Sequence, residues 1–169
     1  MANRTRSKRL FREDRGESLV EFAIAVSVLL MALFGIMDFA RCMYTYHFVS
    51  YAAQQGARYA MVRGADWTTA CASASSYDCS ISSSNESPVE TYVQDLATPG
   101  ITGSSITVTP SWPAENVDGS ATPCTSPNSA NSKGCLVKVV VSYPFKFILP
   151  FLPKGSMTMT ATSEQIIAY

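Results

Sequence analysis

The sequence contains a single histidine, His47, among its 169 residues. It has no Gly-rich phosphate loop, no His-Glu-x-x-His or Gly-x-Ser-x-Gly motif and no Cys-x-x-Cys pair. One histidine offers very little for a catalytic Ser/His/Asp triad or for a metal site built from histidines. The carboxylates are scattered, and no spacing between them is typical of a catalytic pair. We expect that the protein is not an enzyme and that it uses no catalytic residue, metal, cofactor or small-molecule substrate.

Proline and charge are missing from a long stretch near the N-terminus. No proline occurs from Leu19 to Arg63, and the sixteen residues Phe22–Met37 carry no charge. One helix can therefore run through the apolar stretch and well beyond it. At 1.5 Å per residue the uncharged run is about 24 Å long, against a bilayer core of about 30 Å. We expect a membrane-spanning helix with Glu21 and Asp38 near the two membrane faces.

The net charge of zero conceals a strong asymmetry. Residues 1–16 carry six basic and two acidic side chains, whereas residues 17–169 carry seven basic and eleven acidic ones. A basic flank before an apolar span tends to stay in the cytoplasm, so the remainder of the chain is expected to face outward. The alternative is a nucleic-acid-binding arm, but no basic or aromatic patch supports it elsewhere. We therefore expect the membrane as a partner and no nucleic acid.

The first fifteen residues are polar and have no hydrophobic period, so we expect a disordered leader. A secretory signal peptide would also combine a basic segment with an apolar run. No good Ala-x-Ala site follows this run closely, because the nearest candidate is Ser50-Tyr51-Ala52, beyond Arg41 and His47. Cleavage by a signal peptidase is therefore disfavoured.

The helix changes character after the apolar run. Asp38 and Arg41 are three residues apart, so their side chains can pair on one helix face. Farther on, small residues recur on one face, namely Ala52, Ala53, Gly56, Ala57 and Ala60. Such a face lets another helix or a sheet approach the backbone closely. We expect it to pack against the chain's own domain, and Arg63-Gly64 to end the helix.

Four cysteines form two locally spaced pairs in loop-like sequence, Cys71/Cys79 and Cys124/Cys135. An oxidising compartment favours disulfides at such positions. Four cysteines allow three connectivities, of which we favour the two local ones. A zinc site is the rival interpretation, but it would lack both Cys-x-x-Cys spacing and histidines. Cys42, inside the long helix, is expected to be a packed free thiol.

A short helix is expected after the Ser-rich residues 65–87. Ser87 is suited to the N-cap, Pro88 to the first helical position and Glu90 to the third position of a capping box. The helix is expected to stop at Thr98-Pro99-Gly100, since proline and glycine are poor helix formers.

Three strands are expected beyond that helix, at residues 104–111, 136–143 and 157–167. The middle one alternates clearly, with Val137, Val139 and Val141 facing inward. The predicted fold class is α+β: a long N-terminal helix with a small antiparallel three-stranded sheet and one short helix packed on its distal half.

The link between the last two strands is unusually apolar. It presents Phe145, Phe147, Ile148, Leu149, Phe151 and Leu152 between prolines. We favour a loop that caps the core. The alternative is an exposed apolar patch for a partner or for the membrane surface.

The start of the apolar helix resembles a known processing motif. Residues 16–22, Gly-Glu-Ser-Leu-Val-Glu-Phe, are similar to the type IV prepilin motif, in which a glycine and four further residues precede Glu-Phe and an apolar helix. More closely, residues 15–64 resemble the TadE-like family of the tight-adherence (Flp) pilus system. The matching features are the VEFA start, the FGIMDF stretch at 34–39 and the small-residue block at 52–60.

The resemblance implies cleavage after Gly16 by a membrane prepilin peptidase, with Glu17 as the new first residue. It assigns Glu21 and Phe22 to subunit assembly. We therefore expect a leader peptide (1–16), a transmembrane and extended helix (17–63) and an extracytoplasmic, disulfide-containing domain (64–169). The resemblance does not cover this last domain, which is pilin-like only in outline. The implied partners are the peptidase, other pilus subunits and assembly proteins of the inner membrane.

Glu21 has two interpretations. A carboxylate at the edge of hydrocarbon is costly unless it reaches the headgroups or meets a cation. It can extend toward Arg15 and the headgroups of its own membrane face. Alternatively, cleavage after Gly16 creates an α-amino group at Glu17, and the same group in a neighbouring subunit supplies the positive charge.

Three functions compete at this point. The first is a minor pilin or pseudopilin that is anchored in the bacterial inner membrane, with its C-terminal domain outside, and assists pilus assembly or secretion. The second is an uncleaved single-pass anchor that presents an extracytoplasmic binding domain. The third is a secreted enzyme released near Ala52, for which the sequence offers no catalytic group.

Overall fold

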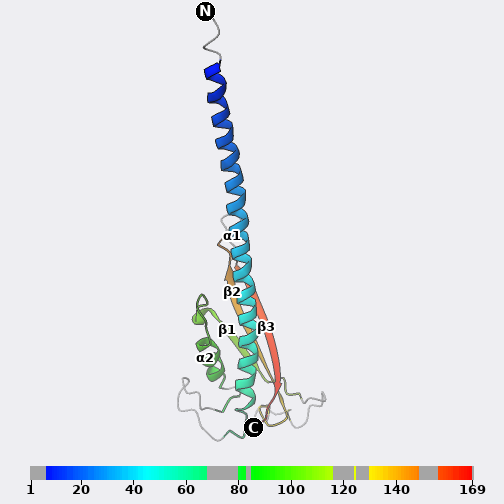
Figure 1. The fold of residues 1–169 in the computed structure, drawn as a ribbon. Helices are drawn as coiled ribbons and strands as arrows, with labels where there is room; N and C mark the ends of the chain where they lie inside the picture. The colour runs from blue at the N-terminus through cyan, green and yellow to red at the C-terminus, as the bar shows by residue number, and fades with distance from the viewer. Residues whose placement is uncertain are drawn as a thin grey trace, which may run out of the picture. The chain divides into compact units, whose positions relative to one another are not determined.

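The computed structural model describes residues 7–67, 80–82, 85–115, 124, 130–148 and 156–168. In chain order its elements are helix α1 (Ser7–Met61), helix α2 (Ser87–Asp95), the short 3₁₀ helix η1 (Gly103–Ser105) and strands β1 (Thr107–Ser111), β2 (Leu136–Lys146) and β3 (Ser156–Ile166) (Figure 1). This is the predicted α+β fold.

The chain divides into two compact units. The N-terminal unit comprises Met1–Arg41 and Ile148–Pro153, and the C-terminal unit comprises Cys42–Phe147 and Lys154–Tyr169. Helix α1 contributes residues to both.

Helix α1 begins earlier and ends slightly earlier than the sequence suggests. The expected disordered leader is wrong for residues 7–15, which are helical from Ser7 onward. Arginine, lysine, leucine and glutamate in this stretch are good helix formers, and no proline occurs before Pro88. At the other end the helix stops at Met61, and the Arg63 N–H donates to the Ala60 carbonyl at 3.1 Å.

Helix α2 lacks the predicted capping box. Ser87 is already the first helical residue, Glu86 holds the cap position, and no side chain caps the helix. The backbone of Glu86 is helical (φ −89°, ψ −23°) and its carbonyl accepts from the Val89 N–H at 3.0 Å. Ser87 therefore lacks the extended conformation that an N-cap requires. Burial, and then the nearby charge of Glu90, raise the pKa of the Glu86 carboxyl above its ordinary value.

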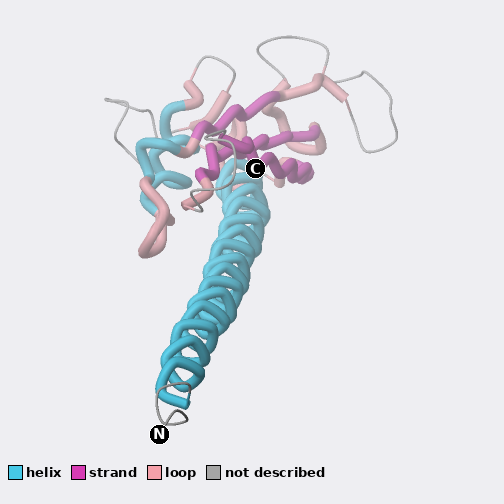
Figure 2. Tube along the Cα trace, turned by 90° about the horizontal axis from the view of Figure 1, so that it is seen from above, coloured by secondary structure: helices cyan, strands magenta, loops and turns pink. Residues whose placement is uncertain are grey.

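The three strands form one antiparallel sheet in the order β1-β2-β3. Figure 2 draws the strands in magenta. Val137, Val139 and Val141 on the central strand are fully buried, which confirms the predicted inward face. Strand β1 begins at Thr107 instead of residue 104, because η1 occupies residues 103–105.

Strand β2 extends three residues past its predicted end and includes Pro144. The ladder with β1 ends where Thr107 pairs with Ser142, whereas the ladder with β3 continues to the pair of Lys146 and Ser156. Beyond Ser142 the strand therefore pairs with β3 alone among the described residues. A proline is tolerated there because its missing N–H belongs to the unpaired side.

The distal part of α1 packs against α2 and β2 through its small residues. Ala52, Ala53, Ala57 and Ala60 are buried. A Cβ added to Gly56 would lie 2.9 Å from Val93 Cγ2 of α2 and 3.2 Å from Val139 Cγ1 of β2. The small-residue face thus packs against the chain's own domain, as predicted, and Gly56 marks the closest approach.

Hydrogen bonds join the loops beyond the end of α1. The buried Asn131 donates through Nδ2 to the Ile81 carbonyl, and its own carbonyl accepts from the Ala65 N–H, both at 2.9 Å. The Ala168 N–H donates to the Met61 carbonyl at 2.9 Å, so the residues after β3 lie beside the end of α1.

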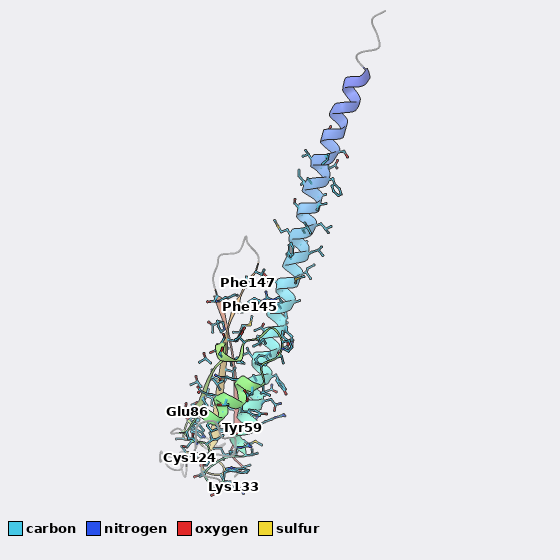
Figure 3. All side chains as sticks on the ribbon, turned by 90° about the vertical axis from the view of Figure 1, so that its left-hand side faces the viewer. Tyr59, Glu86, Cys124, Lys133, Phe145 and Phe147 are labelled. Carbon is cyan, nitrogen blue, oxygen red and sulfur yellow. A yellow bond between two sulfur atoms is a disulfide. The ribbon has the colours of Figure 1, made fainter. Side chains whose placement is uncertain are left out.

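Stacked rings reinforce the contact between α1 and α2. The rings of Tyr59 (labelled in Figure 3) and Tyr92 lie 4.3 Å apart between centroids. The guanidinium of Arg63, just after the end of α1, lies 3.8 Å from the Tyr59 centroid. Stacking and cation–π contacts of this kind add to the area that the rings bury.

We expect Gly56→Val to lower the free energy of unfolding of the C-terminal unit by about 1–3 kcal/mol, because overpacked cores lose about that much. The neighbouring side chains, Val93 and Val139, are buried and have restricted χ1 rotamers, so a change of rotamer that would make room is energetically costly. The measurement is denaturation of the full chain in detergent, followed through the fluorescence of Trp112, which packs against this core.

Gly35→Val is the matched control, since a Cβ at Gly35 meets no atom within 4 Å. It introduces the same side chain into the same helix. Equal stability of the two variants would contradict the close approach at Gly56.

Candidate functional site

The first half of α1 exposes a long apolar surface. The large side chains on it are between 46% and 69% exposed: Leu19, Val20, Phe22, Ile24, Val28, Leu29, Leu30, Met31, Leu33, Phe34, Ile36, Met37 and Phe39. A continuous apolar surface of this size marks a site that contacts a partner or a membrane. The helix is also long and apolar enough to cross a membrane. Hydrocarbon is the environment that this surface fits.

The two residues at which processing was predicted lie on this helix just before the apolar surface. Gly16 and Glu17 are exposed and helical, and a Cβ at Gly16 would meet no atom within 4 Å. Phe22 is 68% exposed. Nothing in the described part of the chain covers the Gly16–Glu17 bond.

Glu21 is exposed, and among the described side chains no cation lies within ion-pair distance of it. The side chain of Arg15, its expected intrachain partner, lies outside the described residues. Glu17 and Glu21 are four residues apart and share one helix face. Both interpretations of Glu21 therefore stay predictions.

Asp38 is the buried carboxylate at the end of the apolar run. Its exposed fraction is 5%, and the Arg41 guanidinium lies 2.9 Å from its Oδ1, which confirms the predicted pair. Its Oδ2 accepts a hydrogen bond from the backbone N–H of Ile148 at 3.0 Å. A buried carboxylate is tolerated because a charged partner and a hydrogen bond compensate its lost hydration.

The contact with Ile148 escaped sequence reasoning. The pair Asp38–Arg41 follows from helix periodicity, whereas Ile148 is 110 residues away in the chain. Every residue except proline has a backbone N–H, so the sequence does not show which N–H will donate to Asp38. The only available signal was that Asp38 ends an uncharged run and therefore needs a partner.

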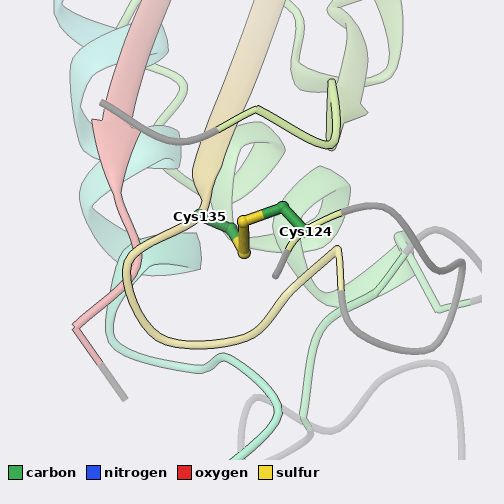
Figure 4. The surroundings of a disulfide bond; sticks show 2 residues. All are labelled: Cys124 and Cys135. Carbon is green, nitrogen blue, oxygen red and sulfur yellow. A yellow bond between two sulfur atoms is a disulfide. The ribbon is translucent and has the colours of Figure 1, made fainter. Parts of the chain in front are cut away.

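Cys124 and Cys135 form a disulfide at the start of β2, with their Cα atoms 5.8 Å apart (Figure 4). Both residues are fully buried and belong to the core. Cys71 and Cys79 lie outside the described residues, so their pairing stays a prediction. Cys42 is a free, half-buried thiol that packs against the core, as predicted.

The apolar segment that was predicted to link the last two strands begins inside β2, and its residues have two different environments. Phe145 is buried and Phe147 lies edge-on to it, with 5.2 Å between ring centroids (Figure 3). Phe145 belongs to the core and the partly buried Phe147 packs against it, as we favoured. Ile148, however, is 71% exposed, so the core-capping interpretation is wrong for this residue. Leu149, Phe151 and Leu152 lie outside the described residues.

Residues 16–58 match the family model described as TadE-like protein. This match confirms the resemblance of the N-terminal region to the TadE-like family, without testing the prepilin processing motif. Comparisons with curated proteins and with solved structures gave no match.

The match and the exposed apolar helix agree with each other. Residues 16–58 are similar to a TadE-like protein, and the helix that carries them is long and apolar enough to cross a membrane.

We expect Asp38→Ala to accelerate hydrogen exchange of the Ile148 amide about tenfold or more. Hydrogen bonds to charged groups contribute about 1.5–3 kcal/mol, and this amide loses its acceptor in the variant. The measurement is hydrogen–deuterium exchange with mass spectrometry on the full chain in lipid nanodiscs, read on the peptide that contains Ile148.

Arg41→Ala is the control, because it removes the charged partner but keeps the oxygen that accepts from Ile148. It should change this exchange rate less than Asp38→Ala does. An unchanged rate in Asp38→Ala would refute the contact.

Proposed function

We propose that this chain is a minor pilin or pseudopilin of a tight-adherence pilus assembly or secretion system, held in the bacterial inner membrane by α1. The observation that carries the proposal is the TadE-like match. It begins at Gly16 and continues through the whole exposed apolar surface to residue 58. The match therefore includes both the processing position and the span.

The charge distribution supports one orientation. Residues 1–16 carry the excess of basic side chains and immediately precede the span, so they stay in the cytoplasm. The C-terminal unit then lies outside the cytoplasm, where oxidation of Cys124 and Cys135 is favoured.

We propose that a prepilin peptidase removes residues 1–16 by cutting between Gly16 and Glu17. The bond is helical and exposed. Glycine costs a helix about 1 kcal/mol relative to alanine, so local unwinding for access to the peptidase is easiest at this residue. A bulkier side chain would both strengthen the helix and add volume at the cleavage position.

Cleavage gives Glu21 its role in this proposal. The new α-amino group at Glu17 of one subunit pairs with the Glu21 carboxylate of another, and Phe22 lies beside it on the lipid-facing surface. A charge at the edge of hydrocarbon needs such a partner. The other pilus subunits and the inner-membrane assembly proteins are the partners of this helix, and its role is structural, with no catalysis.

An uncleaved single-pass anchor is the second candidate. The observation that favours it is the continuity of α1 from Ser7 through Gly16, with no break at the cleavage position. In that case the leader stays attached, and the C-terminal unit serves as an extracytoplasmic binding domain.

We expect the protein extracted from native membranes to begin at Glu17, and Gly16→Leu to retain residues 1–16. The N-terminal peptide is identified by mass spectrometry. Gly35→Leu is the control, since it adds the same side chain to the same helix outside the cleavage motif. A wild-type chain that starts at Met1 or Ala2 in cells with the peptidase would favour the uncleaved anchor.

We expect Glu21→Ala and Glu21→Gln to insert normally but to co-purify with pilus components about tenfold less. A lone charge costs about 2.5–3.5 kcal/mol at the centre of a membrane helix and less at the edge, where the partner's amino group would be left without its counter-ion. Glu164→Gln on β3 is the control, because it removes one carboxylate far along the sequence from the span. Normal recovery of Glu21→Gln would instead fit the uncleaved anchor.

A further inference from the structure

We propose that the chain touches the membrane at a second place, through the exposed side chain of Ile148 just after β2. The occupant of this surface is the boundary between headgroups and acyl chains of the same bilayer that α1 crosses. The inference rests on the proposed membrane span and adds a contact from the opposite end of the sequence.

The depth of Asp38 in the membrane follows from the helix. Phe22–Met37 is uncharged and about 24 Å long at 1.5 Å per residue, somewhat less than a bilayer core of about 30 Å. Asp38 is the next residue. It therefore lies at the edge of the hydrocarbon, where Met37 and Phe39 on either side of it are still exposed.

A hydrogen bond to Asp38 holds the backbone of Ile148 at the same depth in the membrane. The Ile148 N–H donates to Asp38 Oδ2 at 3.0 Å, and both residues belong to the N-terminal unit. The backbone of Ile148 is thus held at the level of Asp38. Its position relative to the membrane follows from this one contact.

The exposure of the two side chains is the reverse of what water would favour. The charged Asp38 is 5% exposed, whereas the apolar Ile148 is 71% exposed. At a lipid boundary this arrangement is favourable, because the ion is covered and the hydrocarbon side chain faces an apolar medium.

Charge compensation allows the arrangement at low dielectric. The Asp38 carboxylate has the Arg41 guanidinium at 2.9 Å on one oxygen and the Ile148 amide on the other. The loop backbone therefore satisfies a polar group of its own while it covers the helix carboxylate. This is the requirement that any backbone near hydrocarbon must meet.

A second copy of the chain or another subunit is the competing occupant. The lipid boundary is favoured because the backbone of Ile148 is hydrogen-bonded to Asp38, and the neighbours of Asp38 on α1, Met37 and Phe39, are exposed apolar residues. The contact should therefore form in a single chain and should not depend on protein concentration.

The experiment places a tryptophan at position 148 of the full chain and measures its fluorescence in vesicles of brominated lipids. Bromine quenches tryptophan on contact, and two lipids are used, one brominated near the headgroup end of the acyl chain and one near the methyl end. The parent chain in the same lipids supplies the background of Trp67 and Trp112.

Ile148→Trp is expected to lose about half of its fluorescence to the shallow bromines and less to the deep ones, because interfacial side chains lie about 5–10 Å into the boundary. Phe34→Trp, within the span, reports the membrane helix and should be quenched more strongly by the deep bromines. Thr162→Trp, exposed on β3, should not be quenched.

The experiment distinguishes failure of the proposed membrane span from failure of the proposed contact at Ile148. If Phe34→Trp is unquenched, the membrane span itself is refuted. If Phe34→Trp is quenched but Ile148→Trp behaves like Thr162→Trp, only the second contact is overturned. A blue shift at position 148 that appears only at high protein-to-lipid ratio would assign the patch to another subunit and would also overturn it.

Asp38→Ala combined with Ile148→Trp tests the hydrogen bond as the positioning device. Loss of shallow quenching at position 148, with Phe34→Trp unaffected by Asp38→Ala, is the expected result. Quenching that is equal with and without Asp38 would overturn the positioning role.

Discussion

One helix has to satisfy two different surroundings along its length, and the other elements are arranged accordingly. Helix α1 satisfies its backbone groups internally, so its side chains alone decide what can lie beside it. In the first half, large apolar side chains are exposed, and they fit hydrocarbon. In the distal half, alanines and Gly56 leave room for α2 and β2 to approach within contact distance of the backbone. The change from large to small residues thus separates the proposed span from the folded domain.

The boundary between these surroundings is where charge reappears. Asp38 is the first charged residue after the uncharged run, and burial would make it costly if it were alone. Its carboxylate instead combines a local ion pair with a backbone amide from the link after β2. A residue that would weaken a purely apolar helix therefore becomes the point at which two distant parts of the chain meet. Structure and proposed membrane placement depend on the same group.

The functional proposal rests on the first third of the chain, and the C-terminal unit has a supporting part in it. The family match ends at residue 58, within α1. Beyond it, the core is held by the central strand β2, the stacked Tyr59 and Tyr92 and the disulfide at the start of β2. The residues of α1 from Cys42 onward belong to this unit.

Local pattern was enough for much of this fold. The long helix, the three strands, the inward valines of β2, the small-residue face and the pair Asp38–Arg41 all follow from periods of two or three to four residues. The missed features depend on partners distant in sequence or on backbone geometry. Glu86 replaced Ser87 at the start of α2 because the preceding backbone was already helical, and Pro144 stayed in β2 because the ladder with β1 had ended. The sequence by itself determined which residues are apolar, charged or small, and hence which elements form. Only the tertiary structure decided that the amide of Ile148 meets the carboxylate of Asp38, because a contact across 110 residues depends on how the whole chain closes on itself.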